Sequence, residues 1–298
     1  MILVTGATGT VGREVVRSFP PGVPLRLMSR NPAGVTVTRP GVEAVAGDYA
    51  STDSLTPALR GVRKAFLVTS RVAGDEGAVF LRAARAAGVR HVVALSAASV
   101  TDARADDLIT RWQRANEELL RHSGMAWTLL RPRSFMSNCL SWAGRVRSER
   151  VVRALYGTSL NACVDPRDIA EVAVRALTED GHEGAAHTLT GPEAISAAEQ
   201  TRLLAQLLGV SLRFEELAPE EARAALLRRH PPELADALLS SARRQRDGAK
   251  AAVGSGVREV TGRPARSFAQ WAADHADAFA PRRPHEGEDI GTSGSALR

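Results

Sequence analysis

The segment Val4-Thr5-Gly6-Ala7-Thr8-Gly9-Thr10-Val11-Gly12 joins a short apolar run at residues 1–5 to an amphipathic stretch at residues 10–19. This order predicts a β-strand, a tight turn and an α-helix. Glycines with this spacing let the backbone turn sharply, let phosphate oxygens approach bare amides, and let the helix pack closely on the sheet. The alternative is a tight turn that holds no ligand. We predict that the loop binds a dinucleotide through Gly6, Thr8, Gly9, Thr10, Val11 and Gly12.

The first 131 residues alternate short runs of Val, Ile and Leu with longer amphipathic segments, as in β-α units around a parallel sheet. Strands are expected at 1–5, 23–29, 42–46, 64–69, 91–96 and 126–131. Helices are expected at 10–19, 52–60, 73–88 and 105–123. The pattern predicts an α/β fold, a doubly wound parallel sheet of the Rossmann type, with an NAD(P)-binding core over residues 1–131.

After residue 131 the regular alternation stops. Helices are expected at 135–146, 165–178, 196–208, 218–228, 232–245 and 264–279, and strands at 186–190 and 211–216. We predict a smaller, mainly helical C-terminal lobe over residues 132–281, with a few elements that return to the core. Residues 282–298 have almost no apolar side chains, so we expect a disordered tail.

Composition excludes several classes of protein. The chain has 298 residues, 44% of them hydrophobic, and no stretch approaches the roughly 18 apolar residues of a membrane span, so we expect a cytoplasmic protein without a membrane partner. Cys139 and Cys163 lie far apart and no two of the 7 histidines have helical metal-ligand spacing, so we predict no disulfide and no metal. Basic residues are scattered among acidic ones despite a net charge of +6, so no nucleic-acid partner is expected.

The end of the second expected strand indicates which nucleotide binds. Loops selective for NAD usually have a carboxylate about 20 residues after the glycines, but no Asp or Glu occurs between Glu14 and Glu43. The strand ends instead in Ser29, Arg30 and Asn31, and a guanidinium can pair with a 2′-phosphate. We therefore predict NADP(H), with NAD(H) less favoured. The alternative is that Arg30 is a surface arginine.

Two further strand ends carry polar side chains. Asp48 and Tyr49 follow the third expected strand, and Thr69, Ser70 and Arg71 follow the fourth. Because ligands bind at the carboxyl ends of such strands, we expect the first pair to contact the adenine and the second group to border the ribose.

A series of motifs runs along the chain: TGATGTVG at 5–12, SRNP at 29–32, GD at 47–48, EELLRHSG at 117–124, TLLRP at 128–132, FMSN at 135–138, DPRDIA at 165–170 and LTGP at 189–192. Together they resemble the NmrA-like, atypical short-chain dehydrogenase/reductase group over residues 1 to about 280. The resemblance implies a Rossmann fold and an NAD(P)H cofactor. It does not imply a substrate, because the group contains quinone, benzylic ether and isoflavone reductases as well as NADP-sensing regulators that turn nothing over.

The sequence departs from typical short-chain reductases, which use a tyrosine with a lysine four residues later for proton transfer. Neither Tyr49 nor Tyr156 has such a lysine, and the two lysines, Lys64 and Lys250, begin the fourth expected strand and lie in the C-terminal lobe, so we expect neither to help catalysis. Where ether and isoflavone reductases carry a functional lysine, the resemblance places Trp112. We expect Trp112 to wall the substrate, and a packing role is the alternative.

The resemblance also bears on residues after the fifth and sixth expected strands. Ser96 matches the serine that hydrogen-bonds substrate in short-chain reductases, and Ser96 and Asn116 are the candidate catalytic donors. Pro132 is expected to fix the turn beside the nicotinamide. We assign Phe135, Asn138 and Trp142 to substrate contact.

Two functions remain open. A reduced ketone is a basic alkoxide that needs a positioned acid, whereas a reduced quinone or an enolate delocalises its charge. A site without the tyrosine and lysine is therefore biased toward conjugated acceptors, and we predict an NADPH-dependent oxidoreductase for a quinone- or enone-like small molecule. The alternative is a non-catalytic NADP(H)-sensing regulator of the NmrA type. Convergence of Trp112, Phe135, Met136 and Trp142 on a pocket favours the enzyme, expected as a monomer or homodimer.

Overall fold

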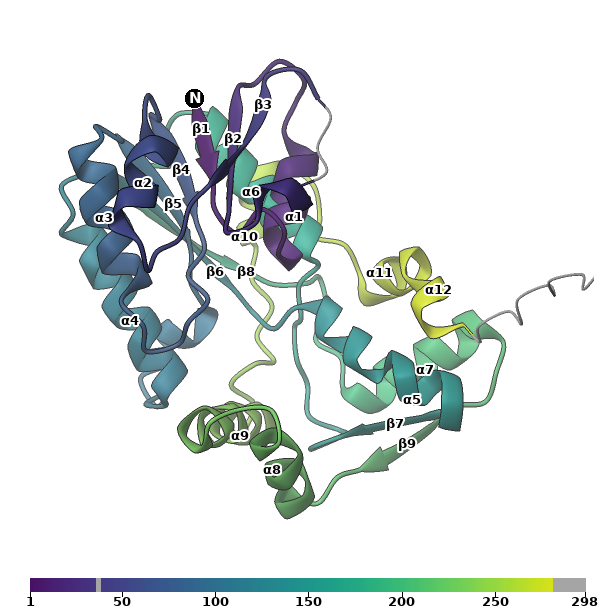
Figure 1. Cartoon of the computed structure of the whole chain (residues 1–298). Coiled ribbons are helices and arrows are strands. Elements are labelled where there is room, and N and C mark those ends of the chain that lie inside the picture. Colours follow the sequence, from purple (N-terminus) through teal and green to yellow (C-terminus); the bar gives the residue numbers. More distant parts are fainter. Residues whose placement is uncertain (36–38, 281–298) are drawn as a thin grey trace, which may run out of the picture.

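The centre of the molecule is one parallel sheet of seven strands (Figure 1). The computed structural model describes residues 1–35 and 39–280, so the tail expected at 282–298 lies outside the described residues. Every pairing in the sheet is parallel, which confirms the expected doubly wound α/β fold. In order across the sheet the strands are β3 (Val42–Ala46), β2 (Leu25–Ser29), β1 (Ile2–Val4), β4 (Lys64–Leu67), β5 (His91–Leu95), β6 (Ala126–Pro132) and β8 (Ala185–Leu189).

The strand order reverses beside β1. The chain moves outward from β1 through β2 to β3, then crosses back to β4 on the other side of β1. The hydroxyl of Thr5 donates to the carbonyl of Phe66 (3.0 Å) and accepts from the amide of Val68 (2.8 Å), which ties the ends of β1 and β4 together. Doubly wound proteins bind ligands in the crevice at such a reversal, outside the carboxyl ends of the strands. That edge of the sheet faces the lower half of the molecule in Figure 1.

Helices cover both faces of the sheet, so the strands are apolar on both sides. In β1, the side chain of Val4 packs in the core on one face of the sheet, and that of Leu3 packs in the core on the other face. The first face carries α1 (Thr10–Ser18), α6 (Pro166–Thr178) and α10 (Gly256–Thr261) (Figure 1). The second carries α2 (Thr52–Leu59), α3 (Glu76–Ala86) and α4 (Leu108–Arg121). Two short 3-10 helices, η1 (Pro32–Gly34) and η2 (Ala98–Thr101), follow β2 and β5.

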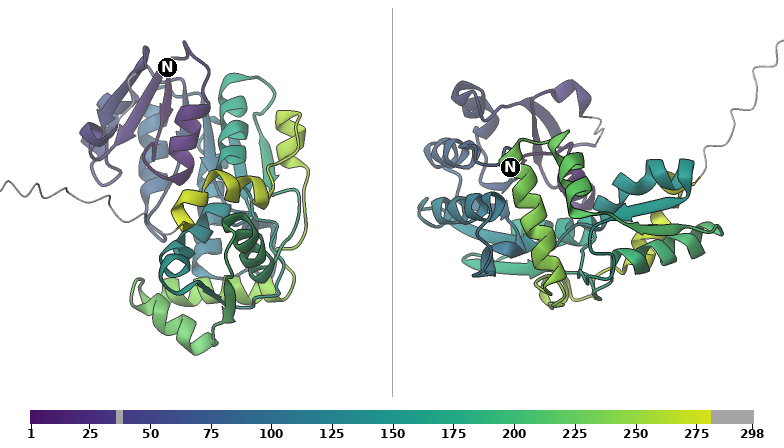
Figure 2. Two further views of the ribbon diagram at one scale, coloured as in Figure 1. Left: turned by 90° about the vertical axis from the view of Figure 1, so that its right-hand side faces the viewer. Right: turned by 90° about the horizontal axis from the view of Figure 1, so that it is seen from below.

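The lower half of the molecule has a core of its own, centred on the buried side chains of Phe268 and Trp271. Its elements are η3 (Met136–Trp142), α5 (Ala143–Glu149), β7 (Val151–Ala154), α7 (Ala197–Leu208), β9 (Arg213–Glu216), α8 (Pro219–Leu227), α9 (Pro232–Arg246), α11 (Phe268–Asp274) and α12 (Ala276–Phe279). Seen from below, α9 lies in front of the carboxyl edge of the sheet (Figure 2, right). The chain returns to the sheet for α6 and β8, and the division at residue 131 stays a prediction.

Several elements differ from the sequence-based expectation, among them α10, which forms where no helix was expected. The helix expected at 264–279 is two short helices, because the side chains of Ser267 and Gln270 cap a helix that begins at Phe268 and the chain bends at His275. The helix expected at 135–146 begins as the 3-10 helix η3. Strand β7 was not expected, and it forms because it pairs with the distant β9. Within residues 1–35 and 39–280, no helix combines the length and the apolar character that crossing a bilayer requires.

Candidate active site

The glycine loop between β1 and α1 is built by close backbone approach. Gly6 has a φ of +61°, a conformation that side chains disfavour. The amide of Gly9 donates to the carbonyl of Gly6 (2.9 Å), and a Cβ on Gly12 would lie 2.0 Å from that same carbonyl oxygen. Gly9 caps α1 without a side chain, so the first amides of the helix, those of Thr10 and Val11, stay open to an anion. This cradle fits the pyrophosphate of a dinucleotide.

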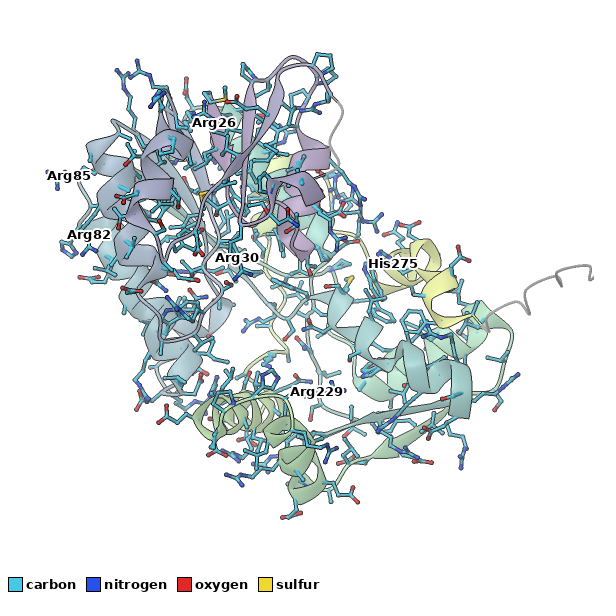
Figure 3. All side chains as sticks on the ribbon, in the orientation of Figure 1. Arg26, Arg30, Arg82, Arg85, Arg229 and His275 are labelled. Atoms are coloured by element: carbon cyan, nitrogen blue, oxygen red, sulfur yellow. The ribbon has the colours of Figure 1, made fainter. Side chains whose placement is uncertain are left out.

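A cavity of about 310 Å³ lies beyond the loop, at the carboxyl ends of β1 to β4. Of the residues expected to bind the cofactor, it brings together Gly6, Thr8, Ser29, Arg30, Asn31, Asp48, Tyr49 and Ser70. Arg30 is exposed at the end of β2, near the centre of the molecule, and no described residue forms an ion pair with it (Figure 3). Its guanidinium is therefore open to a phosphate. Ser29 and Asn31 form the turn beside it, with the hydroxyl of Ser29 accepting from the amide of Asn31 (3.2 Å).

Asp48 and Tyr49, which we expect to contact the adenine, lie on the wall of this cavity after β3. The carboxylate of Asp48 accepts from the amide of Ala50 (3.0 Å), which shapes the turn after β3. The phenol of Tyr49 donates to the carbonyl of Val68 (2.8 Å), and burial raises the pKa of this phenol well above its usual value. Tyr49 therefore stays neutral, and it lines the cavity.

Glu76, which the sequence analysis missed, organises the loop after β4. Its buried carboxylate accepts from the amides of Ser70 (2.7 Å) and Arg71 (3.0 Å) and lines the same cavity. The available signal was its place at the start of α3, a few residues after the polar segment 69–71 that follows β4. The side chain of Arg71 is exposed and lies 3.5 Å from Asp75, while Thr69 lines the neighbouring, larger cavity.

The larger cavity, about 440 Å³, lies at the carboxyl ends of β5 and β6, with α9 on its far side. It is lined by five residues that the sequence analysis had placed in the site, namely Thr69, Ser96, Pro132, Phe135 and Asn138. It is also lined by polar or charged residues that the sequence analysis did not assign to the site, among them Asp102, Gln113, Arg133, Arg244 and Lys250. Because Thr69 and Ser70 line one cavity each, the two cavities meet at the loop after β4.

Ser96 belongs to a buried charged network. The residue is only 6% exposed, and its hydroxyl donates a hydrogen bond to the carboxylate of Glu117 (2.6 Å). Both oxygens of Glu117 accept from Arg131 (2.9 and 2.6 Å), and Arg121 adds a third contact at 3.0 Å. Burial opposes the charge of Glu117, but the hydrogen bonds from Arg131 and Ser96 outweigh it and hold the pKa of the carboxyl below its usual value. The proton of Ser96 therefore points to Glu117, and its lone pairs are what it offers a ligand.

Asn116 and the two tryptophans lie outside the described lining of the larger cavity. Asn116 lines a small cavity beneath it together with Ser96, and its side-chain nitrogen is buried with no acceptor among the described residues. The indole of Trp112 donates to the carbonyl of Gly74 (3.2 Å), and Trp142 packs against the lower core. The roles of these three residues stay predictions.

Lys250, which we expected to lie in the C-terminal lobe and not to help catalysis, lines the larger cavity. Burial lowers the pKa of its ammonium to about 8, and the nearby charges of Arg244 and Arg133 act in the same direction. Lys250 reaches the cavity because the segment after α9 folds back, so that the amide of Ala162 donates to the carbonyl of Lys250 (2.9 Å); whether Lys250 takes part in catalysis stays a prediction. Only two of the 39 basic residues are lysines, and that rarity was the one signal the sequence offered.

Comparisons with known proteins agree with this geometry. A sequence profile described as NAD(P)H-binding matches residues 6–180. The chain is 55% identical over 281 residues to the (4-alkanoyl-5-oxo-2,5-dihydrofuran-3-yl)methyl phosphate reductase of Streptomyces griseus, covering 94% of this chain and 100% of that protein. It is 38% identical over 285 residues to the NAD(P)H azoreductase of Xenophilus azovorans, covering 94% and 99% of the two chains. The crystal structure of an NADPH-dependent quinone oxidoreductase from Escherichia coli with NADPH matches with a TM-score of 0.80, 28% identity and coverage of 93% and 99%.

These relatives decide between the two functions that the sequence left open. The protein is an NAD(P)H-dependent reductase and not a regulator without catalysis, and the expected NADP(H) cofactor is confirmed. The profile match covers more than half of the chain, and the fold, the glycine loop and the relatives point the same way. The chain belongs to the NAD(P)H-binding family, within the NmrA-like, atypical short-chain dehydrogenase/reductase group.

Proposed function

We propose that this reductase transfers hydride from NADPH to a carbon–carbon double bond conjugated with carbonyl groups, in a small acceptor of the butenolide type. The observation that carries the proposal is the composition of the larger cavity. Its described lining joins apolar residues such as Leu95, Phe135 and Leu238 to a few polar ones and includes no tyrosine. The activity named for the Streptomyces griseus relative, a dihydrofuran phosphate reductase, supports the same acceptor class.

The nucleotide cavity supports the preference for NADPH. The open guanidinium of Arg30, with Ser29 and Asn31 beside it, is suited to a 2′-phosphate, and the uncapped start of α1 is suited to the pyrophosphate. When bound, NADPH supplies the hydride and becomes NADP⁺. The task of the chain is to orient the nicotinamide toward the larger cavity, where we expect Pro132 to border the ring.

The acceptor chemistry explains why a tyrosine–lysine pair is dispensable. In a (4-alkanoyl-5-oxo-2,5-dihydrofuran-3-yl)methyl phosphate, ring carbon 4 lies between two carbonyl groups. Hydride addition at carbon 3 breaks the π bond and leaves the electron pair at carbon 4, delocalised over both carbonyl oxygens. Such an enolate is a weak base, so one proton from water or a weak donor completes the reaction. Acceptor, NADPH and H⁺ thus give the saturated ring and NADP⁺.

The two candidate donors, Ser96 and Asn116, differ in their hydrogen bonds. The proton of Ser96 is directed to Glu117, whereas the side-chain nitrogen of Asn116 has no acceptor among the described residues. We propose Asn116 as the hydrogen-bond donor nearest the floor of the cavity, and Ser96 as the residue that fixes the position of that floor.

A direct test is to follow NADPH oxidation by the purified protein with four acceptors: the alkanoyl butenolide phosphate, a benzoquinone, an azo dye and a saturated ketone. We expect oxidation with the butenolide, and deuterium from C4-labelled NADPH at ring carbon 3 of the product. Oxidation with the quinone or the azo dye and none with the butenolide would contradict the proposed acceptor. Deuterium on a carbonyl carbon would contradict the proposed position of hydride transfer.

A further inference from the structure

Three cationic side chains share one end of the larger cavity. Arg133 follows β6 directly, Arg244 lies on α9, and Lys250 lies four residues after that helix ends. One guanidinium nitrogen of Arg133, Nη1, donates to the carbonyl of Ala249 (3.0 Å), so Arg133 and the segment that carries Lys250 lie side by side. The cluster is thus assembled from parts of the chain that are distant in sequence.

Of these three cations, Arg244 alone forms ion pairs with described carboxylates. Arg244, whose side chain is 14% exposed, contacts Asp107 (2.7 Å) and Asp102 (3.6 Å). Asp107 also caps α4 through the amide of Thr110, so its oxygens are occupied. No described carboxylate lies within ion-pair distance of Arg133 or Lys250. Two cations in the cavity wall therefore have no partner of opposite charge in the part of the chain that the structure describes.

A second observation shows that Arg133 is left incomplete. Its Nε is buried and has no acceptor among the described residues. Leaving a charged donor buried and unpaired is costly, and proteins rarely retain such a group unless a ligand completes it. Desolvation also lowers the pKa of both Arg133 and Lys250, and the charges of Asp102 near Arg133 and of Asp107 near Lys250 only partly offset it.

We propose that Arg133 and Lys250, with Arg244 behind them, form a subsite for the phosphate monoester of the acceptor. This inference rests on the proposed function, because it takes the anion to be part of the molecule that is reduced. A phosphate monoester carries close to two negative charges at neutral pH, which matches the two unpartnered cations. The guanidinium Nε and the ammonium supply donors to its oxygens.

The position of the subsite gives it a role in orientation. Arg133 is the residue after Pro132, which we expect beside the nicotinamide. In the butenolide phosphate, one methylene joins the phosphate oxygen to ring carbon 3, the carbon that accepts hydride. An anchored phosphate would therefore hold that carbon near the nicotinamide, and anchoring of this kind accelerates a reaction by restricting the acceptor to a reactive geometry.

The test compares the butenolide phosphate with the corresponding hydroxymethyl butenolide in wild type, Lys250→Met and Lys64→Met. Lys64 is the other lysine of the chain and is the first residue of β4. It therefore lies at the amino ends of the strands, whereas the larger cavity lies at their carboxyl ends, and it is a matched control. We expect Lys250→Met to lower kcat/KM for the phosphate by about 10- to 100-fold, the range for a lost charged hydrogen bond, and to change that for the alcohol by less than about threefold. Lys64→Met should match wild type with both acceptors.

Calorimetric binding of methyl phosphate to the NADP⁺-saturated protein separates the subsite from the reaction. If neither butenolide is reduced but methyl phosphate binds to wild type and to Lys64→Met and not to Lys250→Met, the proposed function fails and the subsite stands. If both butenolides are reduced and Lys250→Met lowers both rates equally, the function stands and the subsite is wrong. Absence of methyl phosphate binding to wild type, together with equal kcat/KM values for the phosphate and the alcohol, would also overturn the subsite.

Discussion

The two cavities differ in how the chain builds them. All described lining residues of the nucleotide cavity come from the first 76 residues, and most of them directly follow a strand of the sheet. The larger cavity draws its lining from residues as distant as Thr69 and Lys250. Cofactor binding is thus a property of local strand–turn–helix units, whereas acceptor binding depends on packing of the C-terminal half against the sheet. Each prediction below acts on one cavity and should leave the other unchanged.

The largest effect is expected on the acceptor side, at Glu117. Its carboxylate is 3% exposed and contacts Arg131, Arg121 and Ser96. Glu117→Ala leaves Arg131 without its partner, and we expect a loss of about 3–5 kcal/mol in the free energy of unfolding, as for other broken buried ion pairs. Denaturant unfolding measures it.

The neighbouring Glu118→Ala is the matched control, because Glu118 is exposed and its carboxylate, among the described residues, forms an ion pair with the exposed His122 alone. We expect it to change stability by less than about 0.5 kcal/mol. If both variants lost the same free energy of unfolding, the hydrogen bonds of Glu117 would not stabilise the strand ends that form the acceptor cavity. NADPH affinity of the folded Glu117→Ala protein should equal that of wild type.

On the nucleotide side, Gly12→Ala is expected to cost about 1–3 kcal/mol of stability, the range for overpacking. A Cβ at this position lies 2.0 Å from the carbonyl oxygen of Gly6, so the loop must open and lose its fit to the pyrophosphate. Calorimetry with NADPH should show little or no binding. Gly144→Ala, whose Cβ meets nothing within 4 Å, should bind NADPH as wild type does. Normal NADPH affinity in Gly12→Ala would break the link between the loop and the cofactor.

The same difference explains what the sequence could predict. The succession of strands along the chain follows from periodicity, and the glycine loop follows from glycine spacing. The cavity residues from Ser29 to Ser70 could be proposed because each lies at or just after a strand end, and a strand end and its loop are contiguous in the chain. Lys250 could not be placed, because its position depends on how α9 and the segment after it pack on β6. Strand β7 was missed for a similar reason, since its partner β9 lies far along the chain.

Arg30→Ala is expected to change the affinity for NADPH and NADH to different extents. We expect NADPH affinity to fall by about 10- to 100-fold, the range for lost charged hydrogen bonds, and NADH affinity to stay the same. Arg82→Ala is a suitable control, because Arg82 is exposed on the outer side of α3 and away from the cavity (Figure 3). An equal fall for NADPH and NADH would show that Arg30 does not read the 2′-phosphate. The KM for the acceptor should not change in either variant.

The smallest expected effect is the pH dependence of acceptor use. The groups that face Lys250 are Arg133 after β6, Arg244 on α9, and the carboxylates of Asp102 after η2 and Asp107 at the start of α4. Burial and the two arginines hold its pKa at about 8, so Lys250 loses its charge as the pH rises through that value. Since the phosphate is fully ionised above about pH 7, kcat/KM for the butenolide phosphate should fall by about tenfold between about pH 7 and pH 9.

Lys250→Arg supplies the control for this profile, because a guanidinium stays protonated throughout the range. Its kcat/KM for the phosphate should stay level where that of wild type falls, and the hydroxymethyl butenolide should give a level profile with both proteins. The KM for NADPH should be flat for all of them, because the nucleotide cavity is built without Lys250. A fall shared by Lys250→Arg would assign the titration to another group, and a fall shared by the alcohol would separate it from the phosphate. Either result would remove Lys250 from the acceptor subsite while leaving the nucleotide cavity as described.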